Sequence, residues 1–232
     1  MRIFAISDLH LSTTTSKPMD IFGPVWENYL GDIEKSIVEA GVCDDDIILI
    51  PGDISWAMKL EEAVPDLKYI ASLPGKKIII RGNHDYWWKG ISAVRGILPS
   101  GMYAIQNDSI KIGDKIFCGT RGWTVPENAH KSAEDEKIFN REIQRLELSL
   151  KDAMRQRTND EEIIAMVHYP PFDLLRHDSP FTELFEKYGV KKVVFGHLHS
   201  YDKKQNLVST KNGIVYYLTS CDLLGNKIVE IV

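Results

Sequence analysis

The chain has 232 residues, of which 44% are hydrophobic, and this length and composition fit one globular domain with an ordinary buried core. The formal net charge of −5 at pH 7 argues against a binder of duplex nucleic acid, which needs a basic face to neutralise phosphates. The three cysteines lie far apart in the chain and include no CxxC pair, so they indicate neither a disulfide framework nor a zinc knuckle.

The first apolar run, from Met1 to Ile6, is too short for a signal peptide, and no stretch reaches the length of a membrane span. We therefore expect a cytoplasmic protein without stable membrane insertion, folded as a single domain over residues 1–232. The sequence contains no internal repeat or linker, and it favours no particular oligomeric state.

In the first hundred residues, apolar runs that read as strands alternate with amphipathic stretches that read as helices. The expected strands lie at 3–6, 46–50 and 77–80. The expected helices lie at 24–41, 57–73 and 91–98. The first of these helices reads as a crossover between strands, and Gly41 stops it. Pro65 must interrupt the second, so we expect two short helices there, with Pro65 at the start of the latter.

Beyond residue 100 the pattern changes to alternation, which predicts antiparallel strands. A hairpin is expected at 110–118, around the turn Gly113-Asp114. Ser132 and Asp135 resemble a capping box, and the amphipathic helix that follows should reach Arg157 and cover the sheet. The remaining expected elements are strands at 162–167 and 190–195, a helix at 182–188, and antiparallel tail strands at 207–210, 214–219 and 227–232.

Five of the apolar runs end within about three residues of side chains that can bind a metal ion. These side chains are Asp8 and His10, Asp53, Asn83 and His84, His168, and His197 with His199. Five of the seven histidines of the chain lie at these junctions, which chance explains poorly. Because α/β proteins assemble their sites at the carboxyl ends of strands, the spacing predicts one shared site.

A mixture of carboxylates, imidazoles and an amide suits manganese, iron or zinc, and the absence of thiolates disfavours a structural zinc site. The ligands are too many for one ion. They are about right for two ions that share a carboxylate, roughly 3.5–4 Å apart, as in other two-metal sites. Asp53 is the candidate for the shared ligand.

At this point a family resemblance is plain. In chain order, the motifs of this sequence resemble the five motifs of the calcineurin-like metallophosphoesterase superfamily: Asp8-x-His10, Gly52-Asp53, Gly82-Asn83-His84-Asp85, His168 and Gly196-His197-x-His199. The resemblance implies that one metal is held by Asp8, His10, Asp53 and His199. It implies that the other is held by Asp53, Asn83, His168 and His197. It also implies an α/β (α+β) fold with two packed mixed β-sheets flanked by helices, a four-layer sandwich.

The chemistry that the resemblance implies is hydrolysis of a phosphodiester or phosphomonoester by a metal-bound hydroxide. The family pattern assigns His84 to the substrate, where its imidazolium stabilises the transition state or protonates the leaving oxygen. Asp85 is then expected to fix the tautomer of His84 and raise its basicity. The same stretch also fits a hydrogen-bonded polar turn after a strand.

Other residues are weaker candidates for substrate binding. Arg121 could contact a phosphate and Trp123 could stack on the substrate, although a packed loop fits both equally well. His177 is a further candidate, but it and His130 also fit solvated surface positions. Three tryptophans beside the motifs fit core packing better than a pocket wall: Trp56, Trp87 and Trp88.

Differences between the motifs of this chain and those of several branches of the superfamily narrow the range of expected substrates. Protein phosphatases carry an arginine soon after the second motif, whereas this chain continues from Asp53 to Trp56 without one, and its third motif ends in Asp85 rather than glutamate. The opening Ser7 to Leu11 resembles UDP-diacylglucosamine pyrophosphatases, which usually lack the histidine found here as His84. The repair nucleases need further domains. What remains is a small bacterial-type phosphohydrolase acting on a small phosphate ester; the alternative of another class is a catalytically silent binding or scaffold module.

Overall fold

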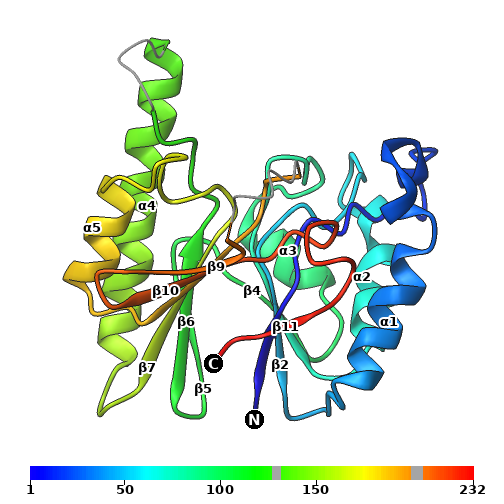
Figure 1. Ribbon diagram of the computed structural model, residues 1–232, viewed down its shortest axis with the longest axis horizontal. Helices are drawn as coiled ribbons and strands as arrows, with labels where there is room; N and C mark the ends of the chain where they lie inside the picture. The colour runs from blue at the N-terminus through cyan, green and yellow to red at the C-terminus, as the bar shows by residue number, and fades with distance from the viewer. Residues whose placement is uncertain (127–131, 200–205) are drawn as a thin grey trace.

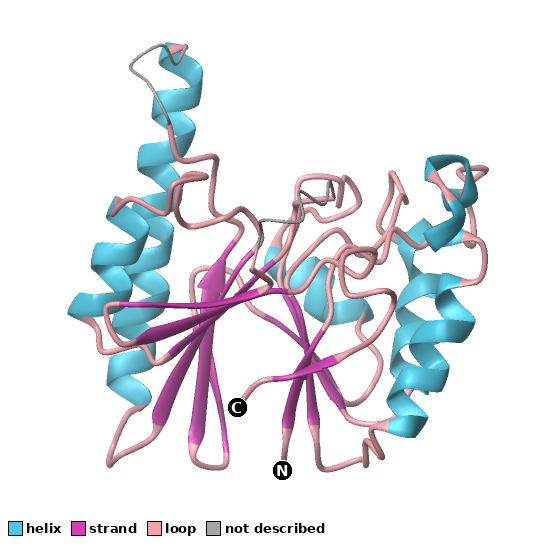
Figure 2. Ribbon diagram, viewed as in Figure 1, coloured by secondary structure: helices cyan, strands magenta, loops and turns pink. Residues whose placement is uncertain are grey.

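The computed structural model describes residues 1–126, 132–199 and 206–232. Two mixed β-sheets pack face to face, and helices cover the outer face of each (Figure 1, Figure 2). The expected four-layer arrangement of helices and sheets is therefore confirmed. In the described part of the chain, no helix is both long enough and apolar enough to cross a membrane.

The first sheet has the strand order β11-β1-β2-β3-β4. Its strands are β1 (Ile3–Ala5), β2 (Ile47–Ile50), β3 (Lys76–Ile79), β4 (Met102–Ala104) and β11 (Val229–Glu230). Strands β1 to β4 are parallel, and β11 joins the edge antiparallel to β1. The helical segments of this half are η1 (Met19–Phe22), η2 (Pro24–Trp26), α1 (Tyr29–Glu39), η3 (Glu61–Ala63), α2 (Val64–Ser72) and α3 (Ile91–Ile97).

The second sheet has the strand order β5-β6-β7-β8-β10-β9. Its strands are β5 (Ser109–Ile112), β6 (Lys115–Thr120), β7 (Glu162–Val167), β8 (Lys192–Phe195), β9 (Val208–Lys211) and β10 (Ile214–Leu218). The four central strands are parallel, and the edge strands β5 and β9 are antiparallel to their neighbours. Helices α4 (Ala133–Gln156) and α5 (Pro180–Lys187) cover this sheet.

Three apolar layers hold the sandwich together. The middle layer lies between the sheets, where Ile47 and Leu49 of one sheet belong to the same buried cluster as Phe117 and Ile164 of the other. The outer layers fill the space between each sheet and its helices. Because side chains alternate between the faces of a strand, both faces of the central strands are buried, which explains their unbroken apolar runs.

Several local expectations are confirmed. Pro65 lies in the first turn of α2, and the β5–β6 hairpin is antiparallel. Ser132 caps α4 by accepting a hydrogen bond from the backbone N–H of Asp135 (3.1 Å). The long helix packs on the second sheet through its apolar stripe, as its pattern predicted.

Other elements differ from their predicted form. The helix expected at 24–41 is divided, because η2 ends at Trp26 and the backbone of Asn28 leaves the helical region (φ −131°) before α1 begins. The tail forms antiparallel strands as expected, in the pairs β9–β10 and β11–β1, but β10 also pairs with β8 in parallel. Such long-range pairing depends on which strand edges are open, and local alternation does not specify it.

Candidate metal centre

The side chains predicted to bind metal come together where the strands of both sheets end. Asp8 and His10 follow β1, Asp53 follows β2, and Asn83 follows β3. His168 follows β7 directly, and His197 and His199 follow β8. The two sheets are joined here because the backbone N–H of His197 donates to both carboxylate oxygens of Asp8 (3.1 Å each).

A first group of four residues offers ligand atoms that all lie within 4.8 Å of one another: Asp8, His10, Asp53 and His199. The Nε2 atoms of His10 and His199 are 3.4 Å apart, and His199 Nε2 lies 3.5 Å from Asp8 Oδ1. His10 Nε2 lies 3.8 Å from Asp53 Oδ2. Donor atoms at these separations can surround one cation.

A second group surrounds the side-chain oxygen of Asn83. His168 Nε2 lies 2.6 Å from Asn83 Oδ1, and His197 Nδ1 lies 2.9 Å from the same oxygen. The other ring nitrogen of His168, Nδ1, lies 3.0 Å from the carbonyl oxygen of Pro51, which assigns the proton to Nδ1. The lone pair of Nε2 then faces the lone pairs of the amide oxygen. A cation between them would remove this repulsion.

Asp53 lies between the two groups. Its Oδ1 accepts a hydrogen bond from the backbone N–H of His84 (2.8 Å), whereas its Oδ2 is buried without a hydrogen-bond partner. Oδ2 is 3.8 Å from His10 Nε2 and 3.5 Å from His168 Nε2. A buried carboxylate oxygen without a partner is costly, and an oxygen next to both groups fits a ligand shared by two ions.

The backbone at these strand ends is strained. Asp8, His10, Asp53 and His197 all have positive φ, at 58°, 47°, 52° and 74°. Residues other than glycine rarely adopt this left-handed region, and such strain gathers at functional sites. The strain turns successive side chains of the motifs toward one point, an arrangement that extended strands alone would not give.

Gly82 is required by the close approach of Asp53. A Cβ atom at Gly82 would collide with the backbone nitrogen and the carboxylate of Asp53. We expect Gly82→Ala to displace Asp53, reduce metal binding and lower the free energy of unfolding by about 3 kcal/mol, the cost of an overpacked site. Metal content and denaturant unfolding measure both effects.

The matched control for that substitution is Gly96→Ala. A Cβ atom at Gly96 would meet no atom within 4 Å, and the residue lies inside α3, where alanine favours the helix. Gly96→Ala should keep full metal content and unfold no more easily than the parent. Unchanged metal content in Gly82→Ala would show that Asp53 tolerates displacement.

The electrostatics of the centre favour a positive ion. Burial, together with the charge of Asp53, raises the pKa of Asp8 to about 6 although His168 opposes the shift, and burial with the charge of Asp85 raises the pKa of Asp53. Burial and neighbouring histidines lower the pKa of His10 to about 2 and that of His197 to about 3. The imidazoles of His10 and His197 are therefore neutral at pH 7, and the carboxylates need a cation to ionise without penalty.

These shifts give the stability of the protein a pH dependence. The pKa of Asp8 in the metal-free fold lies above its ordinary value, so its contribution to stability is present at low pH and is lost as the pH rises through about 6. A bound cation compensates the ionised carboxylates. We therefore expect the difference in Tm between metal-loaded and metal-free protein to grow between about pH 5 and pH 8, as differential scanning calorimetry would measure. A difference in Tm that shrinks over this range would contradict the assignment of these carboxylates as metal ligands.

Two residues that were not predicted from the sequence, Asp222 and Tyr169, contact histidines of the centre. Asp222 Oδ1 lies 3.2 Å from His199 Nδ1. Burial lowers the pKa of His199, but the hydrogen bond and charge of Asp222, together with the charges of Asp8 and Asp53, raise it overall. The contact leaves His199 Nε2 to face the first group. The ring of Tyr169 packs against that of His197, with centroids 4.1 Å apart.

Asp85 has a different contact from the one expected. Its carboxylate accepts hydrogen bonds from the backbone N–H groups of Ile54 (2.9 Å) and Gly82 (2.7 Å) and from Trp87 Nε1 (3.0 Å). His84 Nδ1 has no hydrogen-bond partner, so the expected bond that would fix the tautomer of His84 is absent. The buried carboxylate is occupied in joining the backbones of the second and third motifs, and it influences His84 through its charge.

The His84 ring is half-buried beside the first group. Its centroid is 5.5 Å from that of His10, and the indole of Trp56 lies against both rings, at 4.7 Å from His84 and 4.8 Å from His10. Trp56 therefore lines the site, and it also packs against the core between the first sheet and its helices, as expected. Trp87 and Trp88 are buried in the core, as expected.

The weaker candidates lie around the centre rather than in it. The guanidinium of Arg121 is 3.7 Å from the buried Glu142 and stacks over Trp123, whose ring lies 5.1 Å from that of Tyr169. His177 is exposed and hydrogen-bonded to Asp173 (2.7 Å). None of these side chains belongs to the two groups of candidate ligands. His130 lies outside the described residues.

A family model described as "Calcineurin-like phosphoesterase" matches residues 1–201. No curated protein sequence matches the chain. Three solved structures align with nearly the whole chain: the phosphopantetheinyl hydrolase of Mycobacterium tuberculosis (14% identity, 100% of this chain and 95% of that one, TM-score 0.56), a protein of Thermus thermophilus (12%, 99% and 98%, 0.55) and a protein of unknown function from Aquifex aeolicus (15%, 99% and 95%, 0.50). At these identities the likeness concerns the fold alone.

Proposed function

The chain belongs to the calcineurin-like phosphoesterase family, and on that premise we propose that it hydrolyses a small phosphodiester or phosphomonoester with two metal ions. The observation that carries the proposal is the position of Asp53 Oδ2, which is buried, has no hydrogen-bond partner and lies next to His10 and His168. A carboxylate oxygen so placed fits the ligand that two ions share.

Each ion would have four ligands from the chain. One would be held by Asp8, His10, Asp53 and His199, whose ligand atoms lie close together. The other would be held by Asp53, Asn83, His168 and His197. When bound, such ions supply Lewis acidity to the phosphoryl oxygens and lower the pKa of a bound water. The nitrogen and oxygen donors fit manganese or iron, and zinc as well.

His84 is the group that would act on the leaving oxygen. It lies beside the first group of ligands, and its Nδ1 has no partner. Burial and the neighbouring His168 lower its pKa, so the free ring is neutral at pH 7. A bound phosphate favours the imidazolium again because of its negative charge, and His84 can then protonate the oxygen that leaves.

The alternative is a module that keeps the fold and only binds a partner. Such silent relatives would be expected to replace motif residues, whereas this chain has every ligand position filled from Asp8 to His199. A reaction like that of the UDP-diacylglucosamine pyrophosphatases has less support, because His84 occupies the position where those enzymes usually lack a histidine.

The test is metal analysis combined with rates on two substrates. Protein stripped with a chelator and reloaded with Mn²⁺, Fe²⁺ or Zn²⁺ is assayed with bis(p-nitrophenyl) phosphate, a diester, and p-nitrophenyl phosphate, a monoester. The proposal predicts hydrolysis that appears only with metal, and the ratio of the two rates identifies the ester class. Metal-loaded protein that hydrolyses neither ester would support the silent module instead.

A further inference from the structure

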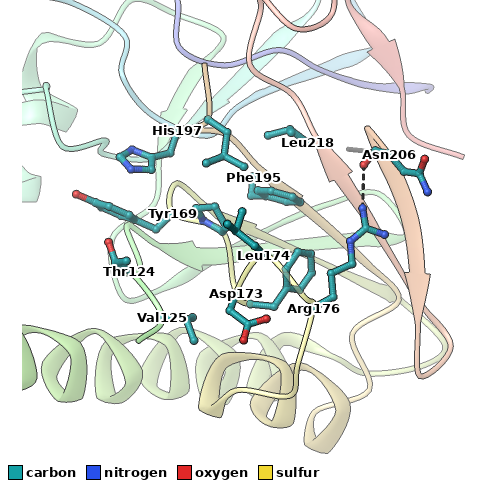
Figure 3. A pocket seen from close by; sticks show the side chains of 13 residues that line it. Thr124, Val125, Tyr169, Asp173, Leu174, Arg176, Phe195, His197, Asn206 and Leu218 are labelled. Atoms are coloured by element: carbon teal, nitrogen blue, oxygen red, sulfur yellow. Dashed lines mark hydrogen bonds between the residues drawn. The ribbon is translucent and has the colours of Figure 1, made fainter. Parts of the chain in front are cut away.

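A cavity of about 330 Å³ opens beside the candidate metal centre, on the side of the second sheet (Figure 3). His197 belongs to both: its Nδ1 lies 2.9 Å from Asn83 Oδ1, and its ring lines the cavity. The other lining residues come from the loops after β6, β7 and β8, from the ends of β8 and β10, and from Asn206 just before β9. A phosphate held at the centre would therefore have this cavity next to it.

The wall nearest the protein core is apolar and largely aromatic. Tyr169, Phe172, Phe195 and Leu218 line it, and each of these side chains is buried. The rings of Phe172 and Phe195 pack edge to face, with centroids 5.7 Å apart, and Tyr169 leans on His197. Phe172, Phe195 and Leu218 belong to the core between the second sheet and its helices, so this wall has a fixed shape.

Polar groups occupy the end of the cavity away from His197 (Figure 3). There the guanidinium of Arg176 donates to the carbonyl oxygen of Asn206 (3.3 Å) and lies 6.0 Å from the ring centroid of Phe172. Asp173 lies on the same loop as Arg176. Leu174 also lines the cavity although it is 70% exposed, which leaves an apolar side chain in water at the edge.

The volume exceeds what a phosphate group alone needs and lies at the lower end of the range for small-molecule sites, roughly 300–1,000 Å³. Apolar walls with a few polar groups at one end are typical of sites that bind an organic ring and fix its orientation. We propose that this cavity binds an aromatic ring in the organic group of the phosphate ester that the centre cleaves. The inference rests on the proposed function and narrows its substrate class.

The first experiment compares two non-hydrolysable probes on the metal-loaded protein. Phenylphosphonate and methylphosphonate carry the same phosphonate group, and only the former has a ring for the cavity. Calorimetric titration should give a Kd for phenylphosphonate that is lower by about tenfold or more, the expected result of burying one ring. Hexylphosphonate, which has the same number of carbons in a flexible chain, should bind less tightly than phenylphosphonate. Tighter binding of hexylphosphonate would show that the cavity prefers an alkyl chain to an aromatic ring and would overturn the proposal.

The second experiment fills the cavity. Val125 is half-buried in the lining, at the edge of the core of the second sheet, so the larger side chain of Val125→Trp should fill part of the cavity. We expect this variant to bind phenylphosphonate no better than methylphosphonate while it keeps the affinity of the parent for methylphosphonate. The matched control is Leu175→Trp. Leu175 follows the lining residue Leu174, is 78% exposed and does not itself line the cavity, so this variant should still prefer phenylphosphonate to methylphosphonate.

The outcomes separate this inference from the proposed function. If the parent hydrolyses p-nitrophenyl esters but binds both probes equally, the cavity inference fails and the proposed function stands. A preference that survives Val125→Trp would likewise overturn the cavity as the binding site. If the metal-loaded parent hydrolyses no ester, the proposed function fails, whatever the probes show.

Discussion

Replacing Asp53 by asparagine is expected to lower kcat/KM by at least about 10³-fold and to reduce the bound metal, because it removes the one anion that both ions would share. The change is nearly isosteric. Asparagine keeps an oxygen that can accept the hydrogen bond from the His84 backbone, which Asp53 Oδ1 accepts at 2.8 Å. It also removes a buried carboxylate whose pKa burial has raised. The metal-free variant should therefore be at least as stable as the metal-free parent at pH 7.

The matched control is Asp46→Asn, at the opposite end of the same strand. Asp46 is buried just before β2, where it accepts hydrogen bonds from the backbone and side chain of Arg2 (2.6 Å and 2.9 Å). This variant should lose stability and keep its metal and its kcat. If Asp53→Asn retained two ions and most of its rate, the shared ligand would have to be another residue.

Replacing His84 by alanine is expected to leave the metal content unchanged and to lower kcat by about 10²–10⁴-fold, the range for losing a general acid. The imidazole lies outside both ligand groups, with its ring centroid 5.5 Å from that of His10. Its removal should therefore impair protonation of the leaving oxygen and leave metal binding unchanged. Metal analysis and initial rates on the same preparation separate these effects.

Tyr86→Phe provides the control for His84. The Tyr86 ring is 44% exposed and lies 6.2 Å from the His84 ring, so this variant changes the neighbourhood without touching the ligands. It should keep the rate of the parent. Loss of metal from His84→Ala would mean that His84 is itself a ligand. A normal rate would mean that the leaving oxygen obtains its proton elsewhere.

The convergence of the candidate ligands was predictable because the signals are local. An apolar run followed at once by Asp8 and His10, or by Asn83 and His84, places those groups at a strand end whatever the rest of the fold. The capping box of α4 and the proline of α2 are equally local, and both expectations are confirmed. Each depends on a few neighbouring residues and on backbone geometry.

Features that depend on distant packing could not be read from the sequence. Asp222 contacts His199 from a segment with no recognisable motif, and Trp56 lies in the site only because two histidines pack against it. The carboxylate of Asp85 binds the backbone of Ile54, 31 residues away, rather than the adjacent imidazole. The left-handed backbone of four candidate ligands, Asp8, His10, Asp53 and His197, likewise follows from tertiary contacts that override local preference.

Anomalous diffraction from crystals of manganese-loaded protein tests the central claim most directly. The account predicts two anomalous peaks, roughly 3.5–4 Å apart, with Asp53 between them. One peak should contact Asp8, His10 and His199, and the other Asn83, His168 and His197. A single peak, or two peaks that do not share Asp53, would contradict it.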